Sequence, residues 1–215
     1  MKLFFTAFCA LAFAASAWAA DDKKAVETVV HKTVDQILVV LKDKELSRDE
    51  KRKRVLKAID PVVDFPLMAK LSLGKKHWKN LDAKERQTFS DLFVERLKAS
   101  YFEKLDLFTD ERVEFKEAVQ KKKKFTVVTY IVSRGERMEV AYKLYNKKRA
   151  WTVYDFEIEG VSVVRSYSSQ YREFLREGSF EDLVAKMREK IEAAKKKEKS
   201  EEEPQKAADK KASKE

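Results

Sequence analysis

Few side chains in this sequence could carry out chemistry, and they lie far apart. The chain has two histidines, His31 and His77, and a single cysteine, Cys9. Ser162 follows Gly160, but the G-x-S-x-G pattern that presents a serine nucleophile is absent. Ser162 stands between a strand-like run and a helix-like run, so we expect its hydroxyl to cap the helix. No phosphate-binding glycine loop, zinc motif or calcium loop is present either.

Asp155 and Glu157 are the remaining candidates for catalysis, because two neighbouring carboxylates can act as general acid and general base. The interpretation that we favour is that Asp155 is held by backbone amides or by an arginine. Apolar surface, in contrast, is abundant along the chain. The sequence therefore predicts a binding protein that is not an enzyme and uses no cofactor or metal ion.

Residues 1–19 have the pattern of an export signal. A lysine near the start precedes an apolar run that is too short for a stable membrane anchor, and small residues end the segment at Ala19. We expect cleavage before Ala20, which removes Cys9 and leaves a chain without thiols or disulfides. Lipid attachment at Cys9 is disfavoured because Phe8 occupies a position that requires a small residue. These features predict a protein exported to a bacterial periplasm.

The composition is strongly charged and basic. Charged residues make up 39% of the chain, and the formal net charge is +10. This excess favours anionic partners, which for an exported protein are phospholipid head groups rather than nucleic acid, although a basic surface can also serve only to keep a protein in solution. The run of lysines at 121–124 is typical of a solvated hairpin turn, with binding to lipid or nucleic acid as the alternative. We expect no nucleic-acid partner and a monomeric protein.

Apolar residues recur at helical spacing in the first third of the chain. Residues 23–41 form one amphipathic pattern. Ser47 with Glu50 three positions later predicts a capping box that opens a second helix, which Pro61 interrupts. Residues 67–73 then form a short third helix.

The longest predicted helix opens at Asp82, with Glu85 three positions later as the partner of a second capping box. One broad stripe of this helix is apolar and rich in aromatic residues: Phe89, Leu92, Phe93, Leu97, Tyr101, Leu105 and Phe108. Such a stripe is typical of an ordinary core, and it could equally form the wall of a cavity.

Four strand-like runs follow: residues 112–118, 125–133, 137–145 and 149–158. Short polar turns join them, which indicates an antiparallel meander. Helices, then strands, then helices predict an α+β fold, with a curved four-stranded antiparallel sheet and several helices enclosing an apolar pocket. A corner at residues 160–162 leads into a helix that Gly178 ends, and a last helix follows. We expect one domain over residues 20–192 and a charged, disordered tail over residues 193–215.

Two groups of residues resemble the MlaC, or toluene-tolerance, family. The first comprises the W-x-V-Y-D run at 151–155 and the E-G-V-S run at 159–162. The second resembles the L-G, W and Q-R-x-x-F…F…L…Y pattern of that family: Leu73, Gly74, Trp78, Glu85, Arg86, Phe89, Phe93, Leu97 and Tyr101. The similarity spans residues 26–188, most of the chain after the export signal. The chain departs from the pattern in its short turn at 134–136, its Arg86-Gln87 order and its long charged tail.

This resemblance implies a periplasmic phospholipid carrier that helps to maintain the lipid asymmetry of the outer membrane. Its partners would be phospholipid, an outer-membrane lipoprotein–porin complex, and an inner-membrane ABC transporter with an MCE-type substrate-binding component. The acyl chains would need a deep pocket with almost no polar wall. A periplasmic chaperone or a binding module for hydrophobic ligands or peptides is the main alternative, and an enzyme with a small hydrophobic substrate is another.

We predict that the lipid pocket lies between the concave face of the sheet and the helices. Strand alternation and the helix stripe nominate the following lipid-binding residues: Val128, Tyr130, Val132, Met138, Val140, Tyr142, Leu144, Trp151, Val153, Phe93, Leu97 and Tyr101. An error in the face of a strand would place its nominated side chains on the opposite side of the sheet.

Overall fold

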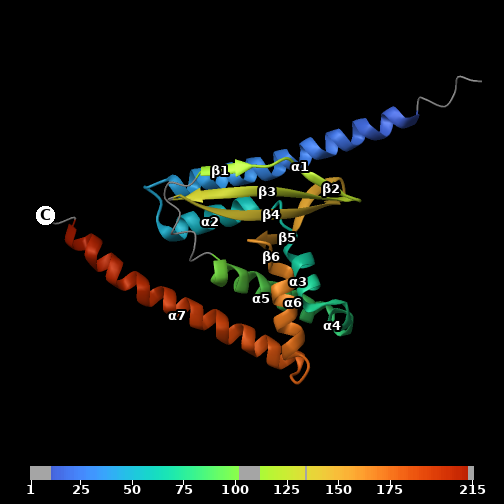
Figure 1. The fold of residues 1–215 in the computed structure, drawn as a ribbon. Coiled ribbons are helices and arrows are strands. Elements are labelled where there is room, and N and C mark those ends of the chain that lie inside the picture. The colour runs from blue at the N-terminus through green and yellow to red at the C-terminus, as the bar shows by residue number, and fades with distance from the viewer. Residues whose placement is uncertain (1–10, 102–111, 134, 213–215) are drawn as a thin grey trace, which may run out of the picture.

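A computed structural model describes residues 11–101, 112–133 and 135–212 of the chain (Figure 1). It has the predicted α+β class. The helices are α1 (Leu11–Lys42), α2 (Arg48–Ile59), α3 (Phe65–Leu73), α4 (Lys75–Asn80), α5 (Ala83–Tyr101), α6 (Val163–Phe174) and α7 (Phe180–Ala212). The strands are β1 (Arg112–Phe115), β2 (Val119–Lys121), β3 (Lys124–Ser133), β4 (Glu136–Lys147), β5 (Ala150–Ile158) and β6 (Val161–Ser162). Leu105 and Phe108 of the aromatic stripe lie outside the described residues.

Local side-chain chemistry sets where the early helices begin. Ser47 and Glu50 form the predicted capping box at the start of α2, with reciprocal backbone hydrogen bonds. Asp82 and Glu85 do the same before α5: the Asp82 N–H donates to Glu85 Oε2 at 2.7 Å, and the Glu85 N–H donates to Asp82 Oδ1 at 2.8 Å. Both predicted helix starts are therefore confirmed.

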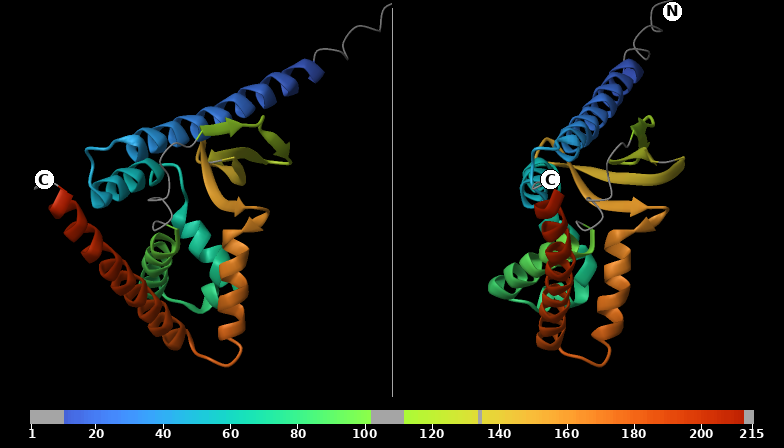
Figure 2. Two further views of the ribbon diagram at one scale, coloured as in Figure 1. Left: turned by 60° about the vertical axis from the view of Figure 1, so that its left-hand side comes forward. Right: turned by 90° about the vertical axis from the view of Figure 1, so that its left-hand side faces the viewer.

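The sheet has six strands rather than the four that we predicted. Its antiparallel order is β1-β3-β4-β5-β6, and β2 pairs with the same strand, β3, as β1 does. The first predicted run, residues 112–118, contains only β1, and a separate short strand, β2, follows it at Val119–Lys121. The short corner after Ile158 adds β6, which pairs with the end of β5. The strands curve, and the sheet is strongly twisted (Figure 2).

The two faces of the sheet differ in what covers them. Side chains of paired residues lie on the same face, and in β3 and β4 the pairs Val127 with Tyr142 and Thr129 with Val140 define what we call the inner face. The pair Val128 with Ala141 lies on the opposite, outer face. Helices α1, α3, α5 and α6 supply apolar side chains that pack with the inner face in one core.

This core joins residues far apart in the sequence. Its largest fully buried side chains come from α3, α5 and the sheet: Met68, Phe89, Phe93, Phe125 and Leu144. Aromatic rings pack edge to face within it, as in the pair Phe93 and Tyr167, whose ring centroids are 5.4 Å apart. Several buried aromatic side chains therefore fix the helices against the sheet.

Asp64 links the start of α3 to the edge of the sheet. Its carboxylate caps α3 by accepting from the Leu67 N–H at 3.1 Å, and it also accepts from Tyr145 Oη at 2.5 Å and Lys147 Nζ at 2.7 Å. Burial raises the pKa of Asp64, but these three donors outweigh it, and the net pKa lies below the usual value. Burial, together with Asp64, raises the pKa of Tyr145 to about 12.

Helices α6 and α7 complete the fold. The first part of α7 packs on the domain through Leu183, Met187 and Ile191, which are buried, and the helix then extends away from the body (Figures 1 and 2). Residues 193–212 continue this helix, where the sequence had indicated a disordered tail. Alanine, lysine and glutamate, which are frequent in this segment, have a high intrinsic helix propensity. Within the described parts of the chain, no helix has the length and apolar character needed to cross a membrane.

Candidate functional site

An apolar cavity lies between α2, α5 and the β4–β5 part of the inner face. Its volume is about 200 Å³, and its wall is almost entirely carbon. The described residues that line it come from four helices, α2, α3, α5 and α6, and from strands β4 and β5: Leu56, Ile59, Phe65, Val94, Leu97, Lys98, Tyr101, Val140, Phe156, Ile158 and Val163. A concave apolar site of this kind binds hydrocarbon rather than polar substrates.

Helix α5 presents one face to the cavity. Val94, Leu97, Lys98 and Tyr101 are spaced three or four positions apart, so they lie together along the helix. Tyr101 is half-buried, and burial raises the pKa of its hydroxyl above the usual value. Lys98 is the charged member of the described lining, and its ammonium group pairs with Glu95 at 2.6 Å. Its aliphatic stem can therefore cover apolar surface while the charge stays near water.

Strands β4 and β5 supply the opposite wall. Val140 pairs with Ile158, and Tyr142 pairs with Phe156, whose rings meet edge to face at 5.8 Å. The Tyr142 hydroxyl lies 3.4 Å from the Thr129 hydroxyl. Burial raises the pKa of Tyr142, although the hydrogen bond with Thr129 acts in the opposite direction. Of these residues, Val140, Phe156 and Ile158 present aliphatic and aromatic carbon to the cavity. Tyr142 is not in the lining: it packs against Phe156, with its hydroxyl beside that of Thr129.

A β-bulge makes this wall continuous. Lys143 pairs with Asp155 but the next residue, Leu144, pairs with Val153, so Tyr154 is an extra residue in β5. The bulge lets Val153 and Phe156 lie on the same inner face although they are three positions apart. It also turns Asp155 to the outer face, away from the apolar wall.

The residues nominated from the sequence fall into three groups. Val140, Leu97 and Tyr101 line the cavity. Phe93, Leu144, Val153, Trp151, Tyr142 and Met138 are not in its lining, although Phe93, Leu144 and Val153 are buried core residues and Tyr142 and Trp151 pack against that core. Met138 is half-buried on the inner face of β4, opposite Ile131.

The third group, from β3, lies on the other side of the sheet, and its expected placement was wrong. Val128, Tyr130 and Val132 pair with outer-face residues of β4, and Tyr130 packs beneath the Arg137 guanidinium at 3.6 Å. Both faces of β3 carry apolar or aromatic residues, so its alternation does not identify the buried side. Thr129 is polar yet fully buried on the inner face. Its burial is tolerated because its hydroxyl donates a hydrogen bond to the Val140 carbonyl oxygen at 3.4 Å.

Sequence reasoning did not nominate most of the cavity wall. It missed Leu56, Ile59, Phe65, Val94, Lys98, Phe156, Ile158 and Val163. A signal was available in β5, because strict alternation from Trp151 would put Asp155 and Glu157 on the apolar face, and that conflict indicates a bulge. For α2 and α6, the sequence shows amphipathic helices but not which of them borders the cavity.

The candidate catalytic residues form a structural corner instead. The Ser162 hydroxyl donates to Asp155 Oδ2 at 2.7 Å and accepts from the Arg165 N–H at 3.1 Å, which caps α6. Asp155 Oδ1 accepts from the Val164 N–H at 3.0 Å, as expected for a carboxylate held by backbone. Both side chains are buried. Among the described residues, no group of three His, Cys, Asp or Glu side chains could hold a metal ion.

Comparisons with known proteins agree with this architecture. The family model described as "MlaC protein" matches residues 31–189. Among solved structures, a phospholipid-binding protein from Ralstonia solanacearum in complex with a phospholipid has a TM-score of 0.71 and 22% sequence identity. The alignment covers 79% of this chain and 98% of that one. A search of curated proteins found no match.

Proposed function

The chain belongs to the MlaC family, and from this premise we propose that it is a periplasmic phospholipid carrier. In this role it takes phospholipid from one membrane complex to another, between an outer-membrane lipoprotein–porin complex and an inner-membrane ABC transporter with an MCE-type component. Such traffic maintains the lipid asymmetry of the outer membrane. The observation that carries the proposal is the carbon-walled cavity between α2, α5 and the sheet. The phospholipid complex of the Ralstonia protein supports the proposal.

The energetics of lipid transfer explain why such a cavity is needed. Two acyl chains carry about thirty methylene groups, and exposing them to water costs on the order of 20 kcal/mol at ~0.8 kcal/mol each. A carrier lowers this cost only where its wall is apolar, because each polar wall group loses its hydration when hydrocarbon covers it. The lining of the cavity meets this requirement.

The size of the cavity indicates how a lipid would enter. A volume of about 200 Å³ lies below the roughly 300–1,000 Å³ of pockets that enclose a drug-sized ligand, and a phospholipid with two acyl chains is larger than such a ligand. Holding two chains therefore requires the walls to separate. Helix α2 is the wall most easily displaced, because Val55 is its one fully buried residue, and its Leu56 and Ile59 contact the cavity while being only half-buried. A short helix held by few buried contacts opens at low free-energy cost.

The head group can remain in water. Lys98 is the charged residue of the described lining, and its weak pairing with Glu95 on the helix surface leaves it able to approach a phosphate. The basic net charge of the chain favours anionic head groups in general. We infer that recognition rests mainly on the acyl chains and only weakly on the head group.

Native mass spectrometry of protein released from bacterial periplasm without detergent tests this function. The expected result is a chain that begins at Ala20 and carries phospholipid, identified after organic extraction. A chain retained in the cytoplasm with residues 1–19 attached would contradict the periplasmic role. An exported chain that is free of lipid would contradict the carrier role and favour the chaperone.

A further inference from the structure

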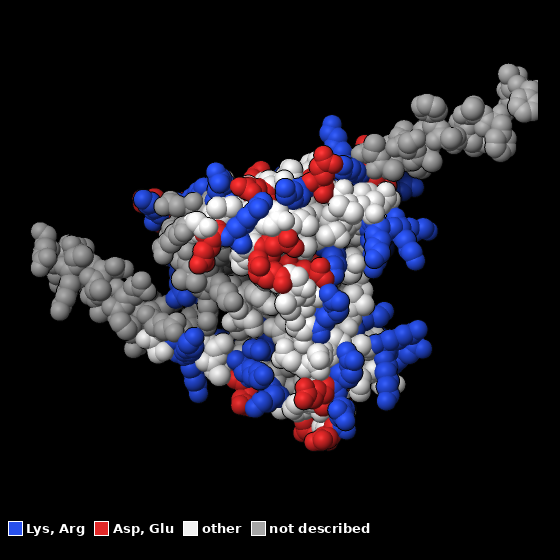
Figure 3. All heavy atoms as spheres, in the orientation of Figure 1, with Lys and Arg blue, Asp and Glu red and all other residues white. Residues whose placement is uncertain are grey.

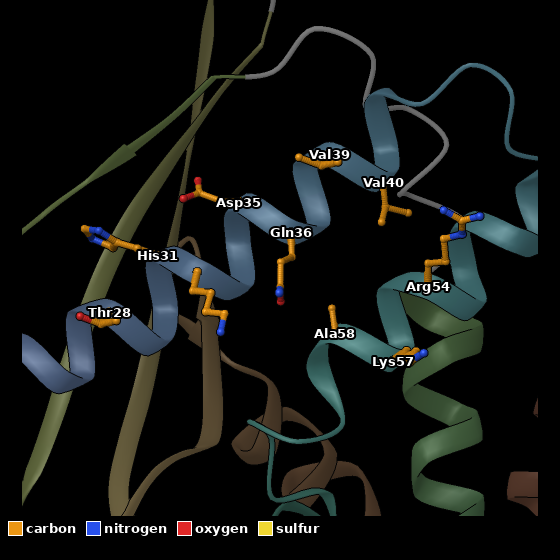
Figure 4. A pocket seen from close by; sticks show the side chains of 10 residues that line it. Thr28, His31, Asp35, Gln36, Val39, Val40, Arg54, Lys57 and Ala58 are labelled. Atoms are coloured by element: carbon orange, nitrogen blue, oxygen red, sulfur yellow. The ribbon is translucent and has the colours of Figure 1, made fainter.

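A second concavity lies outside the apolar cavity described above, between α1 and α2. It has a volume of about 890 Å³ and is widely open to solvent, and Figure 4 shows side chains that line it. Its described lining comprises Thr28, His31, Lys32, Asp35, Gln36, Val39 and Val40 of α1 with Arg54, Lys57 and Ala58 of α2. We call this the α1–α2 groove.

The groove is cationic at its rim. Lys32 of α1 is part of the lining, and α2 contributes Arg54 and Lys57. All three side chains are exposed, and Asp35 is the acidic residue of the lining. Within the described part of the chain, none of the three cations forms a salt bridge within 4 Å, although Arg54 acts on Glu50 of its own helix and helps to lower the pKa of that carboxyl. Exposed cations without a salt-bridge partner around a concave surface favour an anionic occupant.

The groove also has an apolar component. Val39 is 71% exposed, more than any other large apolar side chain described, and it lies in the groove together with Val40 and Ala58. A solvated helix face would carry polar residues at such positions. Exposed apolar groups beside cations that form no salt bridge instead match the pattern of a protein-binding groove, which has an apolar centre and a charged rim.

The shape of the groove distinguishes between the possible anionic partners. Lys and Arg side chains are spread over the face shown in Figure 3, among acidic side chains that gather near its centre and also at its upper and lower edges, so basic charge by itself does not single out a site. A flat membrane surface would contact a convex basic face and would be anchored by exposed aromatic residues. The α1–α2 groove is concave, and its exposed apolar residue is a valine. An amphipathic segment that lies lengthwise between two helices fits this geometry.

We propose that the α1–α2 groove binds an acidic, amphipathic segment of a partner protein. The apolar face of the segment covers Val39, Val40 and Ala58, and its carboxylates pair with Lys32, Arg54 and Lys57. Leu56 and Ile59 of α2 line the apolar cavity. A segment bound in the groove therefore contacts the same helix that forms one wall of that cavity. Binding in the groove does not depend on the cavity carrying lipid.

The test uses a designed helical peptide with leucines along one face and glutamates along the other, and a second peptide with lysines in place of the glutamates. Affinity is measured by fluorescence anisotropy for the wild type and for the triple variant Lys32→Glu, Arg54→Glu, Lys57→Glu. The matched control is a triple variant of α4, Lys75→Glu, Lys76→Glu, Lys79→Glu. These α4 lysines are exposed and lie on the opposite side of the molecule (Figure 1). Both variants have the same net charge, and circular dichroism confirms that each is folded.

We expect the acidic peptide to bind the wild type and the α4 variant alike, and the groove variant at least about tenfold more weakly. The lysine peptide should not bind. Equal weakening in both variants would show a general charge effect and overturn the proposal, as would a wild type that does not bind the acidic peptide. Vesicles of phosphatidylglycerol that bind the wild type but not the groove variant would identify a membrane site and also overturn it.

Discussion

Substitution of Val140 by aspartate should remove lipid binding through a defined electrostatic cost. Val140 lines the apolar cavity between α2, α5 and the sheet, and it is 9% exposed. With the cavity hydrated, the new carboxylate stays ionised, but acyl chains that cover it would strip its water. The carboxyl group can avoid that cost by taking up a proton, which at pH 7 costs about 4 kcal/mol for a group with a pKa of about 3.9. This cost sets a ceiling of roughly 10³-fold on the loss of lipid affinity, and the loss should shrink about tenfold for each unit of lower pH.

The assay is the amount of phospholipid retained by protein purified without detergent, followed by titration with a fluorescent phospholipid between pH 5 and pH 7. Val128→Asp is the matched control, because Val128 is half-buried in the neighbouring strand but faces the outer side of the sheet. It should retain lipid like the wild type. Normal lipid content in Val140→Asp, or loss of lipid in Val128→Asp alone, would refute the assignment of the inner face to lipid.

Three further predictions concern stability and the role of the polar corner. The pKa of Asp64 is lower in the folded protein than its usual value of 3.8. Its contribution to the free energy of unfolding is therefore fully present above about pH 3.8 and is lost as the pH falls through the folded pKa. Urea unfolding should show that the wild type loses its stability advantage over Asp64→Asn in acid. Asp155→Asn should lower the free energy of unfolding by about 2 kcal/mol, because the Ser162 hydroxyl and the Val164 amide lose a charged acceptor. The lipid content of the variant should not change. Unaltered stability together with the loss of a catalytic turnover would favour an enzyme. Phe93→Ala should cost about 3–5 kcal/mol and lower the Tm by roughly 10 °C in a thermal melt, since Phe93 is 0% exposed; a shift below 2 °C would contradict its place in the core.

Much of the architecture follows from local patterns in the sequence. The capping boxes at Ser47 and Asp82 mark where α2 and α5 begin, and Ser162 marks the start of α6, because a capping side chain acts within one helical turn. The meander follows from short turns between strand-like runs. These features depend on neighbours in the sequence, which is why they could be predicted without a structure.

The apolar cavity depends on contacts between distant residues, and here the sequence was a weaker guide. Val140 and Leu97 were found because their strand and helix have one clearly apolar side. Val128 was misplaced because β3 is apolar on both faces and buries the polar Thr129. Which helix closes a cavity depends on packing in three dimensions, and α2 has too little apolar surface to show this role in its sequence alone.

Photo-crosslinking with a phospholipid that carries a diazirine in its acyl chain tests the location of the cavity most directly. After irradiation of the loaded protein, peptide mass spectrometry identifies the labelled residues. The account predicts labels on the cavity wall, at residues 56–59 of α2, 94–101 of α5, and at Val140, Phe156 and Ile158 of the sheet. Labels confined to Val128, Tyr130 and Val132 on the outer face, or the absence of labels from a protein that carries lipid, would contradict it.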